Sequence, residues 1–157
     1  MTIGVNAKPR RFQPIYIGIP LIILMIILHF VYPIQMILRF PFTLIGLVPV
    51  IVGLFINIQG TRVLQRAFKK SGTTDIENPK VLVTEGAFGY SRNPMYLGGI
   101  IAGFGLAILL GSLVTFIFPT IMFLLAHFLH IPQEEDHLKT IFGKEYLDYM
   151  KRVRKWI

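Results

Sequence analysis

Three long stretches without a charged side chain constrain what this chain can fold into. No Lys, Arg, Asp or Glu occurs in residues 12–38, 40–61 or 93–133. A helix that crosses the hydrocarbon core of a bilayer needs about 20 mostly apolar residues. The first two stretches each fit one such helix. The third is about twice as long, is broken near Gly111-Ser112, and fits two. We therefore expect an all-α integral membrane protein with about four transmembrane helices.

The composition agrees with this expectation. Hydrophobic residues make up 54% of the 157 residues, charged residues make up 15%, and the mean hydropathy is +0.62. This balance is typical of a membrane protein rather than of a soluble domain. The chain has no cysteine, which excludes disulfides, thiolate metal ligands and a cysteine nucleophile.

The placement of the basic residues predicts the orientation in the membrane. The formal net charge is +8, which in a soluble protein would suggest nucleic-acid binding. Here the basic residues gather at the N-terminus, between the second and third spans, and in the C-terminal tail. With four spans these segments share one side, and Arg39 alone lies on the other. The positive-inside rule makes the basic side cytoplasmic, where we expect membrane lipids as partners through some attraction to anionic headgroups. We expect a multi-pass protein of a bacterial or archaeal inner membrane, with both termini cytoplasmic and no nucleic-acid partner.

Helix-breaking residues set the expected boundaries. We place the first span at residues 14–38, the second at residues 42–59, the third from Pro94 to the break near Gly111-Ser112, and the fourth at residues 113–129. The second span should continue as a polar helix that ends at Ser71-Gly72, because glycine is a common helix C-cap. The third should start at Pro94 with Asn93 as its N-cap. Pro132 should kink or break the chain before one amphipathic helix over residues 133–153, and residues 72–94 should form an ordered loop.

The polar corner at the start of the third span has two interpretations. Arg92 and Asn93 could be an interfacial anchor and a helix cap, with Tyr96 in the aromatic belt. Alternatively, the helix N-terminus and its positive dipole end could face an anionic group. Glycines just before the corner would let a ligand approach the backbone closely.

The acids after the fourth span also have two interpretations. Glu134, Glu135 and Asp136 could be a solvated first helical turn, where acids are favoured by the helix dipole. A functional interpretation is a carboxylate that holds a cation or accepts hydrogen bonds from ribose hydroxyls.

A histidine-rich set invites a test for metal binding. His127, His130, Glu134 and His137 have spacings of three, four and three, which would place them on one helical face. Such residues can bind iron or zinc. Because Pro132 interrupts the set, we do not expect a metal site. We expect His127 and His130 to face the interior of the bundle near the cytoplasmic surface.

Two segments together resemble a known family. LVTEGAFGYSRNPMYLGG is followed by a helical hairpin and then by EEDHLKTIFGKEYLDYMKRVRKW. This combination resembles the isoprenylcysteine carboxyl methyltransferases, which are related to the membrane phospholipid methyltransferases. It contains an Arg-Asn-Pro-x-Tyr-x-Gly corner, a Glu pair and a Phe-Gly-x-Glu-Tyr-x-x-Tyr motif. The resemblance covers about residues 70–155.

The resemblance implies a membrane enzyme that uses S-adenosylmethionine at a cytoplasmic site. It further implies an N-terminal two-helix hairpin over residues 1–70 and a methyltransferase core over residues 71–157. Arg92 and Glu134 would be catalytic. The implied cofactor-binding residues are Thr73, Lys80, Val81, Leu82, Val83, Phe88, Asn93, Pro94, Met95, Tyr96 and Glu134.

The chemistry of these residues suits that cofactor. Glu134 can pair with positive charge, and Tyr96 can stabilise a sulfonium cation. Methyl transfer needs alignment and exclusion of water more than it needs an acid or a base. Family members with a known substrate carry an Arg near the end of the fourth span. This chain has His130 there, which we assign to the substrate. The acceptor, a lipophilic carboxylate, thiol or amine, stays open, and so does the oligomeric state.

Two other functions remain as alternatives. Membrane sterol reductases have a related C-terminal architecture, although they are usually much longer. Binding of NADPH rather than S-adenosylmethionine would favour a reductase. A non-catalytic membrane scaffold would bind neither cofactor, and substitution of Glu134 or Asn93 would leave its function intact.

Overall fold

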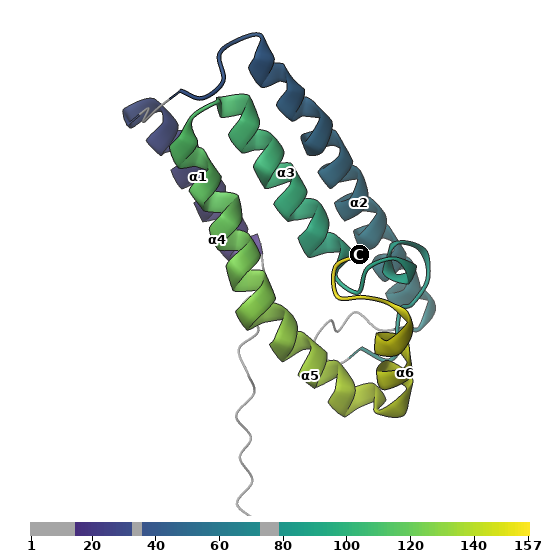
Figure 1. Ribbon diagram of the computed structural model, residues 1–157. Coiled ribbons are helices and arrows are strands. Elements are labelled where there is room, and N and C mark those ends of the chain that lie inside the picture. The colour runs from purple at the N-terminus through teal and green to yellow at the C-terminus, as the bar shows by residue number, and fades with distance from the viewer. Residues whose placement is uncertain (1–14, 33–35, 73–78) are drawn as a thin grey trace, which may run out of the picture.

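The part of the chain that the structure describes is helical and has no β-strand. In the computed structural model, which describes residues 15–32, 36–72 and 79–157, helices account for 79%. The helices are α1 (Ile15–Val31), α2 (Leu47–Lys70), α3 (Pro94–Leu110), α4 (Ile117–Leu125), α5 (Ile131–Phe142) and α6 (Lys144–Arg152). The long helices lie side by side, and α6 lies at the end where α5 finishes (Figure 1).

Two helical stretches are long and apolar enough to cross a membrane. They cover Phe42–Lys70 (29 residues) and Leu113–Phe142 (30 residues). Two shorter apolar helices cover Gly18–Val31 and Pro94–Leu110. Large apolar side chains on the outer face of α2, such as Ile51 and Phe55, are exposed, as expected where lipid replaces a protein partner. The structure thus confirms a helical fold over the residues it describes, with helices suited to a membrane, and the number of spans stays a prediction.

Glycines let α2 and α3 approach each other closely. Gly46, Gly53 and Gly60 recur every seven residues along α2 and its short 3₁₀ lead-in, and they face α3. A Cβ atom at Gly98 of α3 would lie 2.5 Å from the Gly53 carbonyl oxygen and 2.6 Å from the backbone nitrogen of Asn57. Backbones that pack this closely tolerate only glycine. We call this contact the glycine seam.

Several expected boundaries are confirmed. The polar extension of the second span is helical as far as Lys70, and Gly72 follows with φ +67°. The third span starts with Pro94 in its first turn and ends at Gly111, which adopts the left-handed conformation. Asn93 occupies the N-cap position, but its side chain does not cap the helix. The first span is shorter than expected, because α1 ends at Val31 and the chain from Met36 onward is not a long helix.

Of the kink or break expected at Pro132, the break is wrong. The helix of α4 passes through a π-helical turn, Ala126–His130, and continues as α5 to Phe142. Pro132 lies in the first turn of α5. Proline has no backbone N–H to donate, and the wider π-helical turn before it accommodates this missing hydrogen bond. The helix therefore continues past Pro132 instead of ending there.

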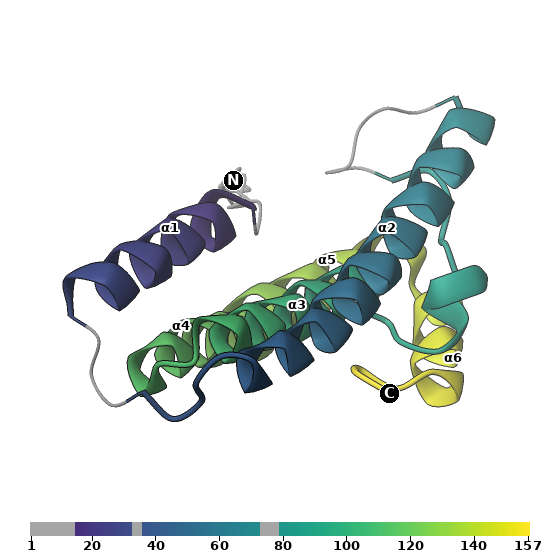
Figure 2. The ribbon, with the colours of Figure 1, turned by 90° about the horizontal axis from the view of Figure 1, so that it is seen from above.

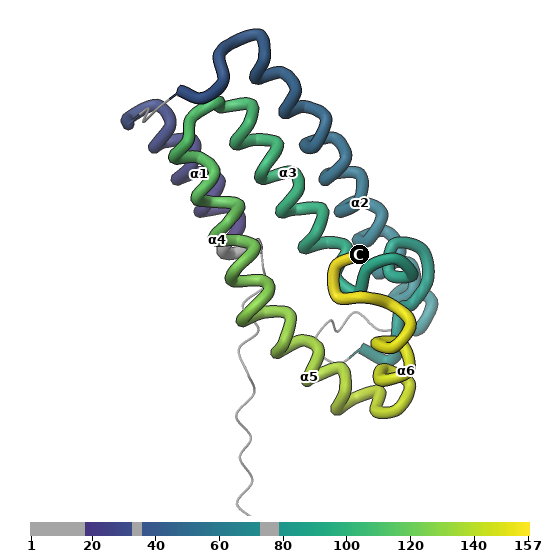
Figure 3. Tube along the Cα trace, in the orientation of Figure 1, coloured from purple at the N-terminus to yellow at the C-terminus, as the bar shows by residue number. Residues whose placement is uncertain are grey.

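The single C-terminal helix expected over residues 133–153 is also wrong. The chain breaks at Gly143, which has φ +52°, so that α5 and α6 are separate helices. After α6 the chain returns toward the start of α3, as the tube shows (Figure 3). This return brings the last residues of the chain beside the polar corner.

The apolar packing divides into two clusters along the bundle. Met25 of α1, Ala107 of α3 and Phe118 of α4 form one. Ile100 of α3, Ala126 of the π turn and Ile131 of α5 form the other, nearer the polar end. Helix α2 packs on α3, although the expected division at residue 70 lies between them. The division therefore stays a prediction.

Candidate active site at the start of α3

Arg92 is the central residue of the polar corner. Its Nε and Nη2 atoms donate to Glu135 Oε1 at 3.1 and 2.7 Å, and its Nη1 donates to the carbonyl oxygens of Val153 and Met150 at 2.8 and 3.2 Å. The side chains of Arg92 and Glu135 are each only 9% exposed. A buried, charge-assisted pair whose guanidinium group also donates to two backbone carbonyls fixes the relative positions of its elements. Arg92 thus joins the corner to α5 and to the end of α6.

The neighbours of Arg92 bind the same returning segment, residues 150–155, which we call the clasp. The Arg92 backbone N–H donates to the Arg154 carbonyl at 3.0 Å. The Asn93 side-chain amide donates to the Lys155 carbonyl at 2.9 Å. Ser91 Oγ accepts from the Asn93 N–H at 3.1 Å and donates to the same Lys155 carbonyl at 3.4 Å. Asn93 is therefore a partner of the clasp, which explains why its side chain does not cap α3.

Glu134 faces a different group from its neighbour Glu135. The Tyr96 hydroxyl donates to Glu134 Oε1 at 2.9 Å. The Tyr96 ring stacks on His130, with ring centroids 6.4 Å apart and an angle of 23° between the planes. These three predicted site residues come from α3, the π turn and α5, and the structure brings them together. A carboxylate beside two aromatic rings can hold a cation or accept hydroxyl hydrogen bonds.

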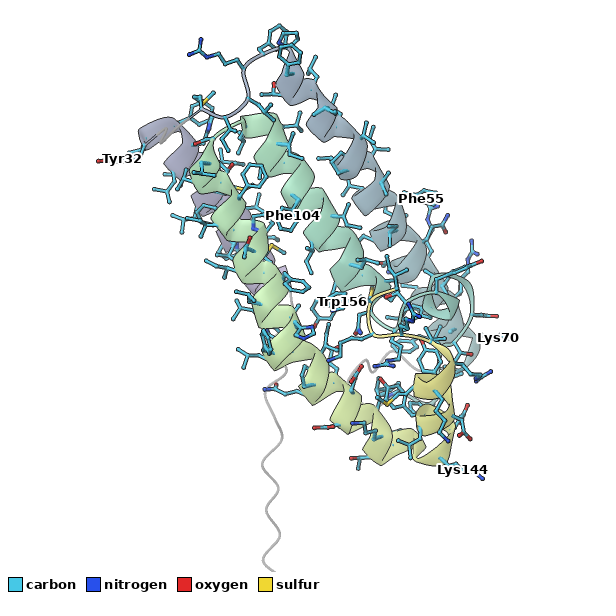
Figure 4. All side chains as sticks on the ribbon, viewed as in Figure 1. Tyr32, Phe55, Lys70, Phe104, Lys144 and Trp156 are labelled. Atoms are coloured by element: carbon cyan, nitrogen blue, oxygen red, sulfur yellow. The ribbon has the colours of Figure 1, made fainter. Side chains whose placement is uncertain are left out.

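The π turn directs both histidines into the bundle, as expected. His127 Nδ1 accepts from the Trp156 indole N–H at 3.1 Å, which assigns the His127 proton to Nε2. The Phe123 ring lies against both, with centroid distances of 5.6 and 5.4 Å. Trp156 lies between α3 and the junction of α4 and α5 (Figure 4). Within residues 15–32, 36–72 and 79–157, no group of three His, Asp or Glu side chains could hold a metal ion.

A buried tyrosine secures the loop before the corner. Tyr149 of α6 donates from its hydroxyl to the Phe88 carbonyl at 2.7 Å, and both residues are buried. Burial raises the pKa of Tyr149 to about 12. Burial, together with the negative charge of Glu135, raises the pKa of Tyr146 well above its ordinary value of 10.0. Both hydroxyls therefore stay protonated at neutral pH.

The other predicted cofactor residues lie around this group. Pro94 is fully buried and faces Gly60 of α2, and the Met95 carbonyl accepts from the Asn57 side chain at 2.9 Å. Before the corner, Val83 is buried and Lys80 is exposed. Cofactor contacts of residues 80–83 stay predictions, and Thr73 lies outside the described residues.

Four residues that hold the site together were not singled out from the sequence as site residues: Asn57, Ser91, Tyr149 and Trp156. Glu135 was named with Glu134 as a candidate carboxylate, but not as the partner of Arg92. A signal existed for Asn57, because a polar amide inside an apolar span usually has a structural or functional partner. No comparable signal distinguished Glu135 from Glu134.

These features define a class: an all-helical membrane protein with a polar, carboxylate-bearing site where its apolar helices end. Comparison with known proteins narrows this class. The model of the phospholipid methyltransferase family matches residues 41–145, and the chain belongs to this family.

The chain is similar to curated enzymes of plants and yeasts. It is 30% identical over 108 residues to protein-S-isoprenylcysteine O-methyltransferase B of Arabidopsis thaliana, covering 69% of this chain and 55% of the relative. It is 32% identical over 114 residues to the protein-S-isoprenylcysteine O-methyltransferase of Saccharomyces cerevisiae, covering 71% and 46%. The chain thus spans about half the length of the curated relatives it matches. No solved structure matches it.

Proposed function

We propose that this protein transfers the methyl group of S-adenosylmethionine to a lipophilic acceptor at the candidate site. The observation that carries the proposal is the Tyr96–His130–Glu134 group. It lies where the apolar helices meet the polar corner, in a chain of the phospholipid methyltransferase family. A water-soluble cofactor and a membrane-soluble acceptor can meet at such a boundary, and enzymes of the family perform this kind of chemistry.

The donor set fits this cofactor. Glu134 offers a carboxylate to hydroxyls or positive charge, and the stacked rings of Tyr96 and His130 offer π faces to a sulfonium cation. When bound, S-adenosylmethionine would supply an electrophilic methyl group. The residues that would hold it are Asn93, Pro94, Met95 and Tyr96 at the start of α3, together with Glu134 on α5.

The residues of the chain contribute positioning and exclusion of water. Tyr96 fixes the Glu134 carboxylate through its hydroxyl, and His130 fixes the Tyr96 ring from the other side. Placement of this accuracy is worth several kcal/mol in a displacement reaction. The aromatic contact of Phe123, His127 and Trp156 closes the apolar side of the site. We place the acceptor beside His130, where it would arrive from the membrane between the helices.

We assign Arg92 a positioning role rather than direct contact with the reacting atoms. Its side chain already donates four hydrogen bonds to groups of the protein, so that few of its five N–H groups remain for a ligand. By holding Glu135, Arg92 sets the rotation of α5 and with it the direction of Glu134.

Four membrane spans, with the site and both termini on the cytoplasmic side, complete the proposal. The basic residues at the polar end of α2 and in α6 support this orientation. We also retain an N-terminal hairpin over residues 1–70 and a catalytic core over residues 71–157 as a proposed division.

Calorimetry on the purified protein in detergent tests the proposal. We expect S-adenosylmethionine and S-adenosylhomocysteine to bind, and Glu134→Gln to weaken binding by roughly 10- to 100-fold, the value of one charge-assisted hydrogen bond. Glu145→Gln, which removes an exposed acid from α6, is the matched control and should bind normally. Absence of binding by folded protein would contradict the proposal, and binding of NADPH instead would identify a reductase.

A further inference from the structure

The polar end of α2 extends beyond the helix on which α2 packs. Gly60 lies opposite Pro94 and Met95, where α3 begins. The helix continues for ten more residues to Lys70, a rise of about 15 Å at 1.5 Å per residue. The view from above shows this end of α2 projecting past α3 (Figure 2).

Three cations on this extension share the outer face of α2. Arg62, Arg66 and Lys69 are separated by four and three residues, the spacing of neighbours on one helical face, and all three are exposed. We call them the outer stripe. Arg62 is nine residues after Gly53, which at 100° per residue puts it on the opposite side of α2 from the glycine seam. The outer stripe therefore points away from the candidate site.

The outer stripe continues the apolar face of the same helix. Phe55 precedes Arg62 by seven residues and is 62% exposed, and Ile51 precedes Phe55 by one turn and is 64% exposed. Seven residues return to nearly the same direction on a helix. Along one face, α2 thus passes directly from side chains suited to lipid tails to side chains suited to anionic groups.

No acid neutralises the outer stripe in the described part of the chain. The three salt bridges found there are Arg92–Glu135, Lys139–Asp136 and Lys151–Asp148. The contacts of α2 with α3 use the opposite face. Three cations on one face with no acidic partner of their own call for anions from outside the chain.

The height of the outer stripe matches the phosphate layer of a bilayer. If the hydrocarbon ends at the level of Gly60 and Pro94, where the apolar part of α3 begins, Arg62 lies about 3 Å and Arg66 about 9 Å beyond it. The polar layer of each leaflet is roughly 5 to 8 Å thick, so the backbone of Arg62 lies within it. The backbones of Arg66 and Lys69 lie further out, but their long side chains can turn back toward the interface. We propose that the outer stripe binds the phosphate group of an anionic phospholipid, whose tails lie along Ile51 and Phe55. This proposal does not depend on the proposed enzyme activity.

Native mass spectrometry of the full chain in detergent tests this inference. The probes are phosphatidylglycerol, which is anionic, and phosphatidylcholine, which is zwitterionic. We expect the wild type to retain phosphatidylglycerol in preference to phosphatidylcholine. Each basic residue near an anionic surface is worth about fivefold in affinity, so that R62Q/R66Q/K69Q should lose retention about a hundredfold. Equal retention by this variant would overturn the proposal.

Two controls separate the outer stripe from its alternatives. K144Q/K151Q/R152Q removes the same number of exposed charges from a different helix, α6, and should retain phosphatidylglycerol like the wild type. Loss of retention in this control as well would show a response to net charge alone and would overturn the site. Inorganic phosphate at constant ionic strength should not displace the lipid. Full displacement would assign the outer stripe to free phosphate instead of a membrane lipid.

Discussion

At the scale of single residues, the polar corner depends on a buried ion pair. Glu135 accepts two hydrogen bonds from Arg92, and both side chains are shielded from water. Removing one partner of such a pair leaves a buried charge without compensation, whereas an exposed pair contributes little. Helix α5 takes part in both kinds of ion pair, because its Asp136 forms a solvent-exposed pair with Lys139.

We expect Glu135→Gln to lower the free energy of unfolding by about 3 to 5 kcal/mol. Asp136→Asn, the matched control, should lower it by at most about 1 kcal/mol. Denaturation of the purified protein in detergent, followed by circular dichroism, measures both. Equal effects of the two substitutions would show that the corner is open to solvent and would contradict the assignment of Arg92 as a positioning residue.

Tyr149 predicts a loss of stability at high pH. Its pKa is raised from 10.0 to about 12, so that the folded protein holds the proton more tightly than the unfolded chain does. This stabilisation is complete below pH 10 and is lost as the pH rises toward 12. Tyr149→Phe removes the hydrogen bond to Phe88 and should cost about 1 to 3 kcal/mol at neutral pH.

The same substitution should change the alkaline limb of the stability profile. Between pH 8 and pH 11 the wild type should lose about 1 kcal/mol through this group, and Tyr149→Phe should lose correspondingly less. Thermal unfolding at several pH values measures the slope. An identical slope in both proteins would show that Tyr149 does not contribute to alkaline unfolding.

At the scale of elements, the glycine seam fixes the distance between α2 and α3. Gly98→Ala would place a methyl group against backbone atoms of α2, and backbone cannot move aside as a side chain can. We expect a loss of about 1 to 3 kcal/mol. Gly99→Ala, one residue later, meets nothing within 4 Å and should leave the unfolding midpoint unchanged. A comparable loss at both positions would place the cost in the substitution itself and not in the seam.

Local signals made some elements predictable. Pro94 starts α3 and Gly111 ends it, because each acts on its own backbone whatever surrounds it. Pro132 gave the opposite result, since the π turn before it supplies a wider path that proline tolerates. Whether proline ends a helix therefore depends on the conformation of the preceding turn, and that conformation cannot be predicted from a single residue.

The site shows the same limit. Tyr96, His130 and Glu134 were expected at the site from their resemblance to a family motif, and the structure brings them together. Glu135 carries the same chemical group as Glu134, and only the rotation of α5 decides which of the two meets Arg92. The clasp is bound through its backbone carbonyls. Every residue has a carbonyl, and so the side chains of the clasp could not predict this role.

At the scale of the whole molecule, the absence of cysteine allows a direct test of topology. Single cysteines in place of Arg39, Lys70 and Lys144 would each report their side of the membrane through an impermeant thiol reagent. With four spans we expect Lys70→Cys and Lys144→Cys to react from the same side of sealed vesicles, and Arg39→Cys from the other. Reaction of all three from one side would refute the four-span arrangement.

The position of the clasp in the sequence also determines the order in which parts of the protein can fold. Ser91, Arg92 and Asn93 find their partners in residues 150–155, about sixty positions later in the chain. When the ribosome has released the corner, the residues that complete it have not yet been synthesised. Under the four-span arrangement, α3 and α4 enter the membrane while the corner is still solvated, and the corner loses its water only when α6 folds back. The polar corner is thus the last part of the molecule to form, because it is completed only after the helices before it have been synthesised.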